Sequence, residues 1–193
     1  MSNLCTVSYI CEAPKEQLDE LYAVLTSLQH SAIPVVENGQ GTLSLACVVR
    51  QLGGDWQQVD CRGVVTDFRR EKNGTLSMEQ YTDWCEQTGF RKFLEQRFHG
   101  MKIYFLEVET GFEVYQTNDV AGRYFPERYF LEANDGFQYF TTLEDAANEV
   151  SEVVGFRVEP DVDGITEAIE VYLSEHEADD VFLGFHEIVV AQD

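Results

Sequence analysis

The sequence predicts an α+β protein in which an antiparallel sheet carries helices on one face and a second, smaller and acidic α+β half follows. Segments rich in β-forming residues, bounded by glycine and asparagine turn signals, predict the strands. Segments with apolar residues at helical spacing predict the helices. Hydrophobic residues make up 44% of the 193 residues and aromatic residues 12%, which is enough for a hydrophobic core.

The first half, residues 1–119, is expected to form one domain. Residues 4–12 are rich in β-forming side chains and predict a strand. Pro14 then suits the first turn of a helix, whose apolar side consists of Leu18, Leu21, Tyr22, Leu25 and Leu28. Residues 41–54 and 61–74 predict two more strands, the second of which ends at the turn signal Asn73-Gly74.

A second helix is expected over residues 78–98. Ser77 with Gln80 three residues later resembles a capping box at its start. Residues 101–119 predict a hairpin around Thr110-Gly111. This order of strands and helices matches the ferredoxin-like plan, in which two helices cover one face of an antiparallel sheet. We expect the following side chains to be buried: Cys5, Tyr9, Leu21, Leu25, Leu45, Cys47, Trp84 and Phe105.

The second half, residues 120–193, is predicted to be a smaller acidic α+β domain, although the lack of a linker leaves open whether the halves share one core. Asn134-Asp135-Gly136 between two aromatic segments predicts a hairpin. Residues 143–154 predict a helix that ends at a glycine. Residues 165–180 predict a second helix, and residues 181–193 a closing strand.

The negative charge is concentrated in the second half. Residues 1–100 hold 9 Lys/Arg and 13 Asp/Glu, whereas residues 101–193 hold 4 and 22. With a formal net charge of -22, direct binding of nucleic acid is not expected, because phosphate recognition needs positive charge. We expect a soluble, cytoplasmic protein without membrane association, because the sequence has no secretory signal and no membrane-spanning apolar run.

Both predicted helices of the second half carry carboxylates opposite their apolar residues. Helical rows repeat about every 5.4 Å, so two such rows would present a broad negative field to a basic protein partner. A solvated helix face is the alternative, since several of the acids lie near helix N-termini, where the macrodipole favours them. The candidate partner-binding residues are Glu144, Asp145, Glu149, Glu152, Glu167, Glu170, Glu175, Asp179 and Asp180. The apolar residues expected beneath the second row are Ile165, Ile169, Tyr172 and Leu173.

The aromatic run within residues 123–140 supports a second hypothesis. Strand alternation would place aromatic side chains on both faces, which is more than one buried face requires. Core and inter-domain packing is one explanation. A ligand or partner patch is the other, because tyrosine and arginine are enriched at interfaces. The candidate patch consists of Tyr124, Arg128, Tyr129 and Tyr139.

The sequence predicts no catalytic residue, no metal site and no cofactor. His176 and His186 are ten residues apart, without the i, i+4 histidine pair that would form a zinc site on a helix. In Asp60-Cys61-Arg62 a cation next to the thiol favours the thiolate, but no cysteine-enzyme motif accompanies it. The glycines match no phosphate-binding motif. These absences favour a binding protein over an enzyme.

Five positions carry a family resemblance, namely Asn3, Cys5, Trp56, Glu109 and Gly111. At these positions the chain resembles a loosely defined family of plasmid-, phage- and conjugative-element-borne bacterial proteins with a ferredoxin-like domain. The shared features are an Asn-x-Cys strand near the N-terminus, a mid-domain tryptophan segment and a late strand with a glutamate-glycine turn. The resemblance covers about 115 residues. It implies an accessory protein of a bacterial mobile element and supplies no catalytic residue.

Three functional hypotheses follow. The first is a non-enzymatic accessory or regulatory protein whose acidic second half docks a basic protein partner. Mimicry of nucleic acid by this acidic half is one form that such docking could take. The second is a small ligand-binding domain or enzyme that uses an aromatic cleft between the halves. The third is an immunity-type protein that neutralises a toxin. The sequence gives no indication of the oligomeric state.

Overall fold

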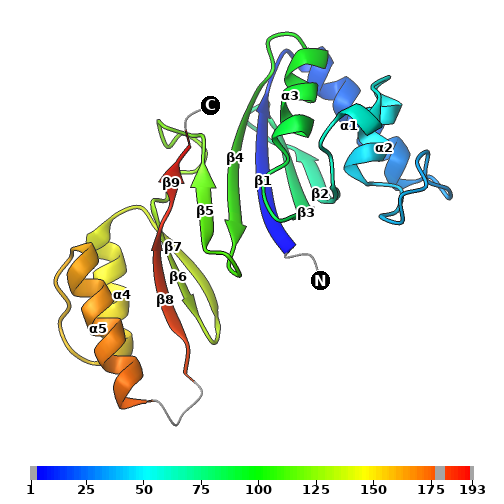
Figure 1. Ribbon diagram of the computed structural model, residues 1–193. Helices are drawn as coiled ribbons and strands as arrows, with labels where there is room; N and C mark the ends of the chain where they lie inside the picture. The colour runs from blue at the N-terminus through cyan, green and yellow to red at the C-terminus, as the bar shows by residue number, and fades with distance from the viewer. Residues whose placement is uncertain (1–3, 177–180, 192–193) are drawn as a thin grey trace. The chain divides into compact units, whose positions relative to one another are not determined.

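The computed structural model describes residues 4–176 and 181–191. The fold is α+β, as predicted, and the chain divides after residue 118 into two compact units that each contain strands and helices (Figure 1). None of the helices within the described residues is long and apolar enough to cross a membrane.

Unit 1, residues 4–118, is built around antiparallel strands in the order β2-β3-β1-β4-β5. Helices α1 and α2 contact β2, and α3 contacts β4, so that the helices cover one face of the sheet (Figure 1). The elements in chain order are β1 (Leu4–Glu12), α1 (Lys15–Gln29), α2 (Leu45–Gln51), the short 3-10 helix η1 (Trp56–Gln58), β2 (Gly63–Arg70), β3 (Leu76–Asp83), α3 (Thr88–Arg97), β4 (Lys102–Glu109) and β5 (Val114–Thr117).

Alternation along β1 gives this sheet its buried face. Successive side chains of a strand point to opposite faces, and every second residue of β1 is buried, namely Cys5, Val7, Tyr9 and Cys11. α1 packs onto this face with Leu18, Leu21, Leu25 and Leu28, which are buried at helical spacing. The predicted first strand and first helix are both confirmed.

The predicted strand at residues 41–54 is wrong, because this segment contains the helix α2. The Ser44 hydroxyl caps the helix and accepts a hydrogen bond from the backbone N–H of Cys47 at 3.2 Å. All residues from Leu45 to Val49 are buried, so this part of the helix is enclosed on every side. An apolar run of this kind has no helical periodicity, and its sequence does not distinguish it from a buried strand.

The helix predicted over residues 78–98 is also wrong in its first part, which belongs to β3. This strand pairs with β1 over its whole length, and only Thr88–Arg97 form the helix α3. The buried positions of β3 include the polar residues Gln80 and Thr82, which hide its alternation in the sequence. Ser77 and Gln80 therefore lie within a strand and do not form a capping box.

Seven of the eight side chains predicted to be buried in unit 1 have at most 4% exposure. The exception is Trp84, which is 43% exposed. Trp84 follows β3 with a φ of +73°, a left-handed conformation that turns the chain towards α3 and moves the indole away from the core.

Unit 2, residues 119–191, has a three-stranded antiparallel sheet in the order β7-β6-β8. Helix α4 contacts β6 and β7, α5 contacts β8, and the two helices lie side by side (Figure 1). The predicted hairpin, the first helix and the closing strand are confirmed. The helix predicted over residues 165–180 begins earlier, at Val162, and ends at Glu175, while residues 177–180 lie outside the described residues. The elements are β6 (Tyr129–Ala133), β7 (Gly136–Phe140), α4 (Leu143–Val154), α5 (Val162–Glu175), β8 (Leu183–Glu187) and β9 (Val189–Val190).

Capping residues determine where the helices of unit 2 begin and end. The side chains of Thr142 and Asp161 accept hydrogen bonds from backbone N–H groups in the first turns of α4 and α5. Gly155 ends α4 in a left-handed conformation with a φ of +81°. The aromatic run from residue 123, to which strand alternation was applied, is irregular over residues 123–128 and becomes a strand only at Tyr129.

Candidate functional site

The outer faces of α4 and α5 carry the carboxylates that the spacing predicted. Glu149 is the exception, because it is half-buried and accepts a hydrogen bond from Gln138 Nε2 at 3.1 Å. Beneath α5, Ile165 and Ile169 are buried, while Tyr172 and Leu173 are half-buried against the same core. Asp179 and Asp180 lie outside the described residues. The exposed carboxylates are those of Glu144, Asp145, Glu152, Glu167, Glu170 and Glu175.

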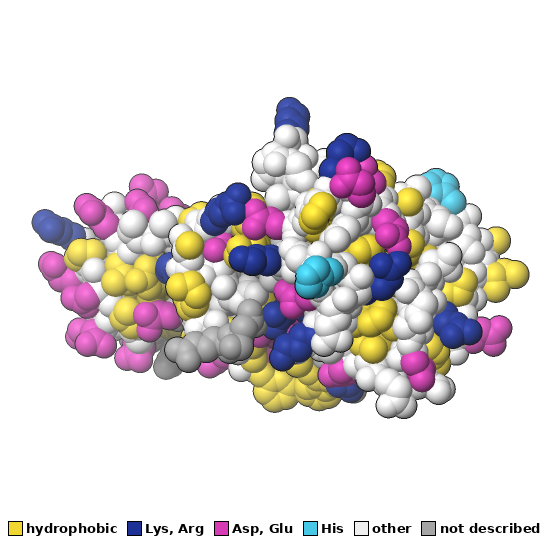
Figure 2. Space-filling model, turned by 90° about the horizontal axis from the view of Figure 1, so that it is seen from above, with side chains coloured by type: hydrophobic (Ala, Val, Ile, Leu, Met, Phe, Trp, Pro, Cys, Tyr) yellow, Lys and Arg dark blue, Asp and Glu magenta, His cyan; other side chains and the backbone are white. Residues whose placement is uncertain are grey.

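These carboxylates have almost no positive charge near them in the sequence. Residues 119–193 hold 19 Asp/Glu and 3 Lys/Arg, and Arg157 is the last basic residue of the chain. Within the described part of the chain, none of the six exposed carboxylates forms an ion pair. Figure 2 shows acidic side chains, in magenta, gathered around hydrophobic ones over unit 2.

The C-terminal turns of α4 and α5 carry acids where a helix favours bases. Glu152 lies in the last turn of α4 and Glu175 in the last turn of α5, and neither turn contains a basic residue. Carboxylates are unfavourable there because the macrodipole is negative at a helix C-terminus. By contrast, Glu144 and Asp145 lie in the favourable first turn of α4. Helix stability therefore explains part of the acidic pattern and leaves the C-terminal acids without an explanation.

An apolar groove lies beside the acidic residues of α5. Phe156 and Val171 are 46% and 42% exposed, and together with Ala168 they line a cavity of about 240 Å³. Glu159 and Glu167 also line this cavity, together with one cation, Arg157. The groove therefore combines exposed apolar side chains with negative charge.

The structure does not bring the four residues of the predicted aromatic patch together on one surface. Tyr129 pairs with Phe140 and Phe130 pairs with Tyr139 across the β6–β7 ladder. Because Tyr129 and Phe130 are consecutive, Tyr129 and Tyr139 lie on opposite faces of this sheet. Tyr129 stacks on Phe185 with ring centroids 5.8 Å apart, and Tyr139 packs edge-on against Phe130 at 5.0 Å.

Arg128 has a structural environment within the loop that precedes β6. Its guanidinium donates hydrogen bonds to the carbonyl oxygens of Phe125 at 2.6 Å, Glu127 at 2.8 Å and Asp119 at 3.0 Å. The Asp119 carboxylate accepts hydrogen bonds from the N–H groups of Tyr124 and Phe125. Burial raises the pKa of Asp119, but these N–H groups, the N–H of Arg123 and the nearby Arg128 charge lower it overall.

The two histidines that were considered as metal ligands lie in different settings. His176 follows α5, and its Nδ1 is 2.8 Å from the carbonyl oxygen of Tyr172. His186 lies on β8, where its ring centroid is 6.2 Å from that of Phe130. Across residues 4–176 and 181–191, no three or more His, Cys, Asp or Glu side chains gather in a way that could hold a metal ion.

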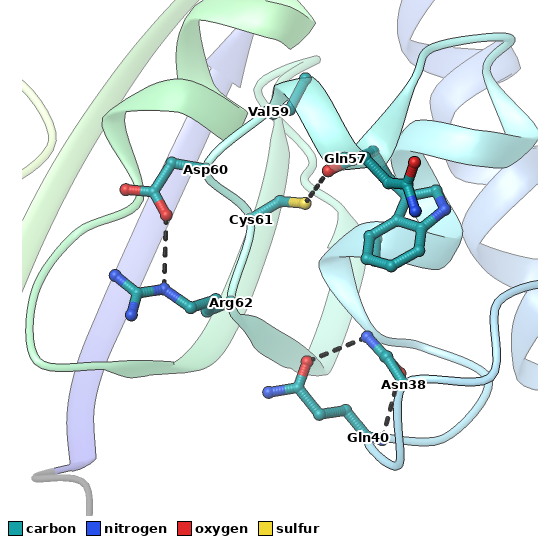
Figure 3. Close-up of a pocket in the computed structure, with 9 residues that line it drawn as sticks. Asn38, Gln40, Gln57, Val59, Asp60, Cys61 and Arg62 are labelled. Carbon is teal, nitrogen blue, oxygen red and sulfur yellow. Dashed lines mark hydrogen bonds and ion pairs between the residues drawn. The ribbon is translucent and has the colours of Figure 1, made fainter.

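Unit 1 contains a polar pocket that the sequence did not predict (Figure 3). Its volume is about 350 Å³, and it is lined by side chains from three separate segments, namely Asn38, Gln40, Ala46, Trp56, Gln57, Val59, Asp60, Cys61 and Arg62. Only the Asp60-Cys61-Arg62 run was singled out in the sequence. The other lining residues come together through the fold of the loop before α2 and of η1.

Cys61 in this pocket is not an activated nucleophile. Burial, followed by the charge of Asp60, raises the pKa of the Cys61 thiol to about 11, although Arg62 is its neighbour in the chain. Arg62 instead pairs with Asp60, with Nε 3.4 Å from Oδ1. The Cys61 Sγ donates to the carbonyl oxygen of Trp56 at 3.6 Å. The thiol is therefore protonated at neutral pH.

A buried polar network lies between β1, α3 and β4. The Glu86 carboxylate accepts hydrogen bonds from the hydroxyl of Tyr9 and from Arg91 Nε, the latter at 3.2 Å. The backbone N–H of Glu86 donates to Glu107, and the Arg91 guanidinium lies 5.1 Å from the centre of the Phe105 ring. These charged side chains are almost fully buried, so the network joins the sheet to α3.

The chain matches no protein-family model, no curated protein and no solved structure.

Proposed function

We propose that this protein binds a basic protein partner through the acidic face of unit 2, defined as Glu144, Asp145, Glu149, Glu152, Glu167, Glu170 and Glu175. The observation that carries the proposal is the position of Glu152 and Glu175 in the last turns of their helices. Stability alone would favour Lys or Arg at these positions. Local rules of this kind are broken most often at functional sites.

The groove beside α5 supports a partner with both basic and apolar side chains. Unscreened carboxylates attract a basic surface over a distance of about one Debye length and speed the encounter. Phe156 and Val171 then offer exposed apolar area for close contact, which is the usual composition of an interface core. Mimicry of nucleic acid is one form of this binding, since the partner would itself carry a basic surface.

For unit 1 we propose a ferredoxin-like domain. Support comes from the antiparallel strand order β2-β3-β1-β4 and from the helices between β1 and β2 and between β3 and β4. The sequence resemblance adds the proposal that the protein is an accessory protein of a bacterial mobile element. Asn3, one of the positions that carry this resemblance, lies outside the described residues.

The experiment uses cytochrome c as a small basic probe and compares two variants of equal net charge. One replaces Glu152, Glu167 and Glu175 by Gln on the acidic face. The other replaces Glu16, Glu37 and Glu113 by Gln, which are exposed carboxylates of unit 1. Titration calorimetry at several salt concentrations should show about tenfold weaker binding and a flatter salt dependence for the first variant only.

Equal weakening in both variants would contradict the proposal, because binding would then follow the net charge of the chain and not the acidic face. Binding that is unchanged in both variants would contradict it as well. Circular dichroism of each variant should show a folded protein, since none of the six replaced carboxylates forms an ion pair within the described residues.

A further inference from the structure

We propose that the pocket beside Cys61 in unit 1 binds a neutral, planar heterocycle with an amide-like hydrogen-bonding edge, which is the chemistry of a free nucleobase or nucleoside. The cavity volume of about 350 Å³ falls within the range of small-molecule sites, roughly 300 to 1,000 Å³. This site lies in unit 1 and does not depend on the acidic face of unit 2.

Two carboxamides supply the hydrogen-bonding groups. Gln40 Oε1 already accepts hydrogen bonds from Asn38 Nδ2 at 3.2 Å and from the N–H of Gly63 at 3.4 Å. Its Nε2 has no hydrogen-bond partner among the described residues, and neither does either amide atom of Gln57. The pocket thus offers one amide donor and one complete donor–acceptor pair. Carboxamides of this kind pair with the edges of nucleobases.

Hydrogen bonds within the protein hold the Gln40 amide and the backbone of Gln57 in place before any ligand binds. Asn38 Oδ1 accepts a hydrogen bond from the backbone N–H of Gln40 at 3.1 Å, and the contact of Asn38 Nδ2 orients the Gln40 amide (Figure 3). Asp55 caps η1 by accepting from the N–H of Gln57 at 3.2 Å. The Gln40 amide therefore loses little conformational entropy when a ligand binds, whereas the exposed Gln57 side chain is ordered by the ligand itself.

The α3 side of the pocket is held by a close backbone approach. A Cβ at Gly89 would lie 2.8 Å from the backbone N and 2.9 Å from the backbone O of Asp60. The absence of a side chain at Gly89 therefore lets the first turn of α3 lie directly against the segment that carries Cys61.

The remaining lining residues favour a flat and uncharged ligand. Trp56 is half-buried in the wall, and stacking of a base on an aromatic side chain contributes about 1–3 kcal/mol. Arg62 is paired with Asp60, so the one cation of the pocket is balanced and a phosphate would also meet the Asp60 carboxylate. The protonated Cys61 thiol adds a neutral, polarizable contact.

Fluorescence of Trp56 provides the test. The chain has two tryptophans, so Trp84→Phe leaves Trp56 as the only one. Adenosine, guanosine, cytidine, uridine and adenosine monophosphate are titrated, with ribose as a control and with toluene, a flat aromatic without a hydrogen-bonding edge, as a competitor. We expect saturable quenching by at least one nucleoside, no quenching by ribose, and binding of toluene and of the monophosphate at least about tenfold weaker than that of the best nucleoside.

Matched substitutions test the hydrogen bonds. Gln57→Leu should weaken nucleoside binding about tenfold, as expected for the loss of one paired edge. Gln58→Leu changes the next residue of η1, which does not line the pocket, and should leave binding unchanged. Gln40→Leu should also weaken binding. Circular dichroism establishes whether this variant, which changes a loop residue, is folded.

Three results would overturn the proposal. The first is the absence of saturation by every nucleoside up to millimolar concentrations. The second is binding of toluene or of the monophosphate as tight as that of the nucleosides. Tight binding of toluene would show that no hydrogen-bonding edge is needed, and tight binding of the monophosphate would show that the ligand need not be neutral. The third is equal binding by the Gln57→Leu and Gln58→Leu variants. Gln57 is exposed, so its substitution keeps the test valid if Gln40→Leu fails to fold.

Discussion

Gln80 is a buried amide whose hydrogen-bonding capacity is not used. It is 1% exposed on β3, and neither its Nε2 nor its Oε1 has a hydrogen-bond partner among the described residues. Gln87 is equally buried, but its amide accepts from the N–H of Arg62 at 2.8 Å and donates to the carbonyl oxygens of Asp83 and Cys85. Burying an unpaired amide costs about 1–3 kcal/mol.

Replacing Gln80 by Met should therefore raise the free energy of unfolding by about 1 kcal/mol or more, because the variant buries no unpaired polar atom. The same replacement at Gln87 should lower it by a similar amount, because Arg62 N–H would lose its acceptor. Urea denaturation of both variants is the measurement. Destabilisation by Gln80→Met would indicate that a bound water satisfies the amide.

Glu107 is a buried carboxyl group whose ionisation is unfavourable in the folded state. Burial raises the pKa of Glu107 and the Glu86 charge adds to this, although the N–H of Glu86 and the Arg91 charge oppose it. The folded state therefore holds the Glu107 proton more tightly than the unfolded state does. The contribution of Glu107 to stability consequently falls as the pH rises from the unfolded pKa, about 4.3, through the raised folded value.

Replacing Glu107 by Gln should stabilise the protein at pH 7 and should lose this advantage near pH 3, where Glu107 is protonated in both states. The Gln side-chain oxygen can still accept the Glu86 N–H. Urea denaturation across this pH range is the measurement, with the exposed Glu16→Gln as control. A gain of equal size at both pH values would show that ionisation of Glu107 is not the cause.

Only those site residues whose positions follow from local spacing could be predicted from the sequence. Helical spacing is local, so it correctly places Glu167 and Glu170 outward and Ile165 and Ile169 inward. The pocket of unit 1 is non-local, because Gln40 and Gln57 come together only after the loop and η1 have folded. Nothing in the spacing of these residues along the chain signals that they line one cavity.

At the scale of elements, two errors of opposite kind leave the predicted order of strands and helices intact. The segment with α2 was assigned to a strand, and the segment with β3 was assigned to a helix. The order from β1 to β5 survives because β2 and β3 take the places of the two predicted middle strands. The two errors have different causes. Burial of Leu45–Val49 removes the periodicity from α2, and the buried polar residues Gln80 and Thr82 obscure the alternation of β3.

The ends of α4 and α5 allow stability and binding to be separated. Glu152→Lys and Glu175→Lys each place a cation in a last turn that contains no basic residue. Each change should raise the free energy of unfolding by about 0.3–1 kcal/mol and should weaken binding of the basic probe. Thermal unfolding and calorimetry measure the two effects. Glu144→Lys is the control, because in the first turn it should weaken binding and also lower stability.

At the scale of the whole molecule, the two units differ in how they balance charge. The ion pairs of unit 1 include Lys15–Asp19, Arg69–Glu71 and Arg97–Glu20, all of which are partly exposed. Exposed pairs of this kind contribute little to stability. Residues 119–192, which contain unit 2, hold 18 acidic and 3 basic residues, so repulsion between like charges dominates the electrostatics of this unit.

Salt should therefore stabilise unit 2 more than unit 1. Raising the ionic strength from about 0.01 to 0.15 M shortens the Debye length from about 30 to 8 Å, which screens repulsion between the rows of carboxylates on α4 and α5. Amide hydrogen exchange at the two ionic strengths measures this separately for each unit. Protection should increase in α4 and α5 and change little in α1 and α3. The Glu152, Glu167 and Glu175 to Gln variant should show a smaller increase, and a loss of protection in α4 and α5 with added salt would contradict the repulsion argument.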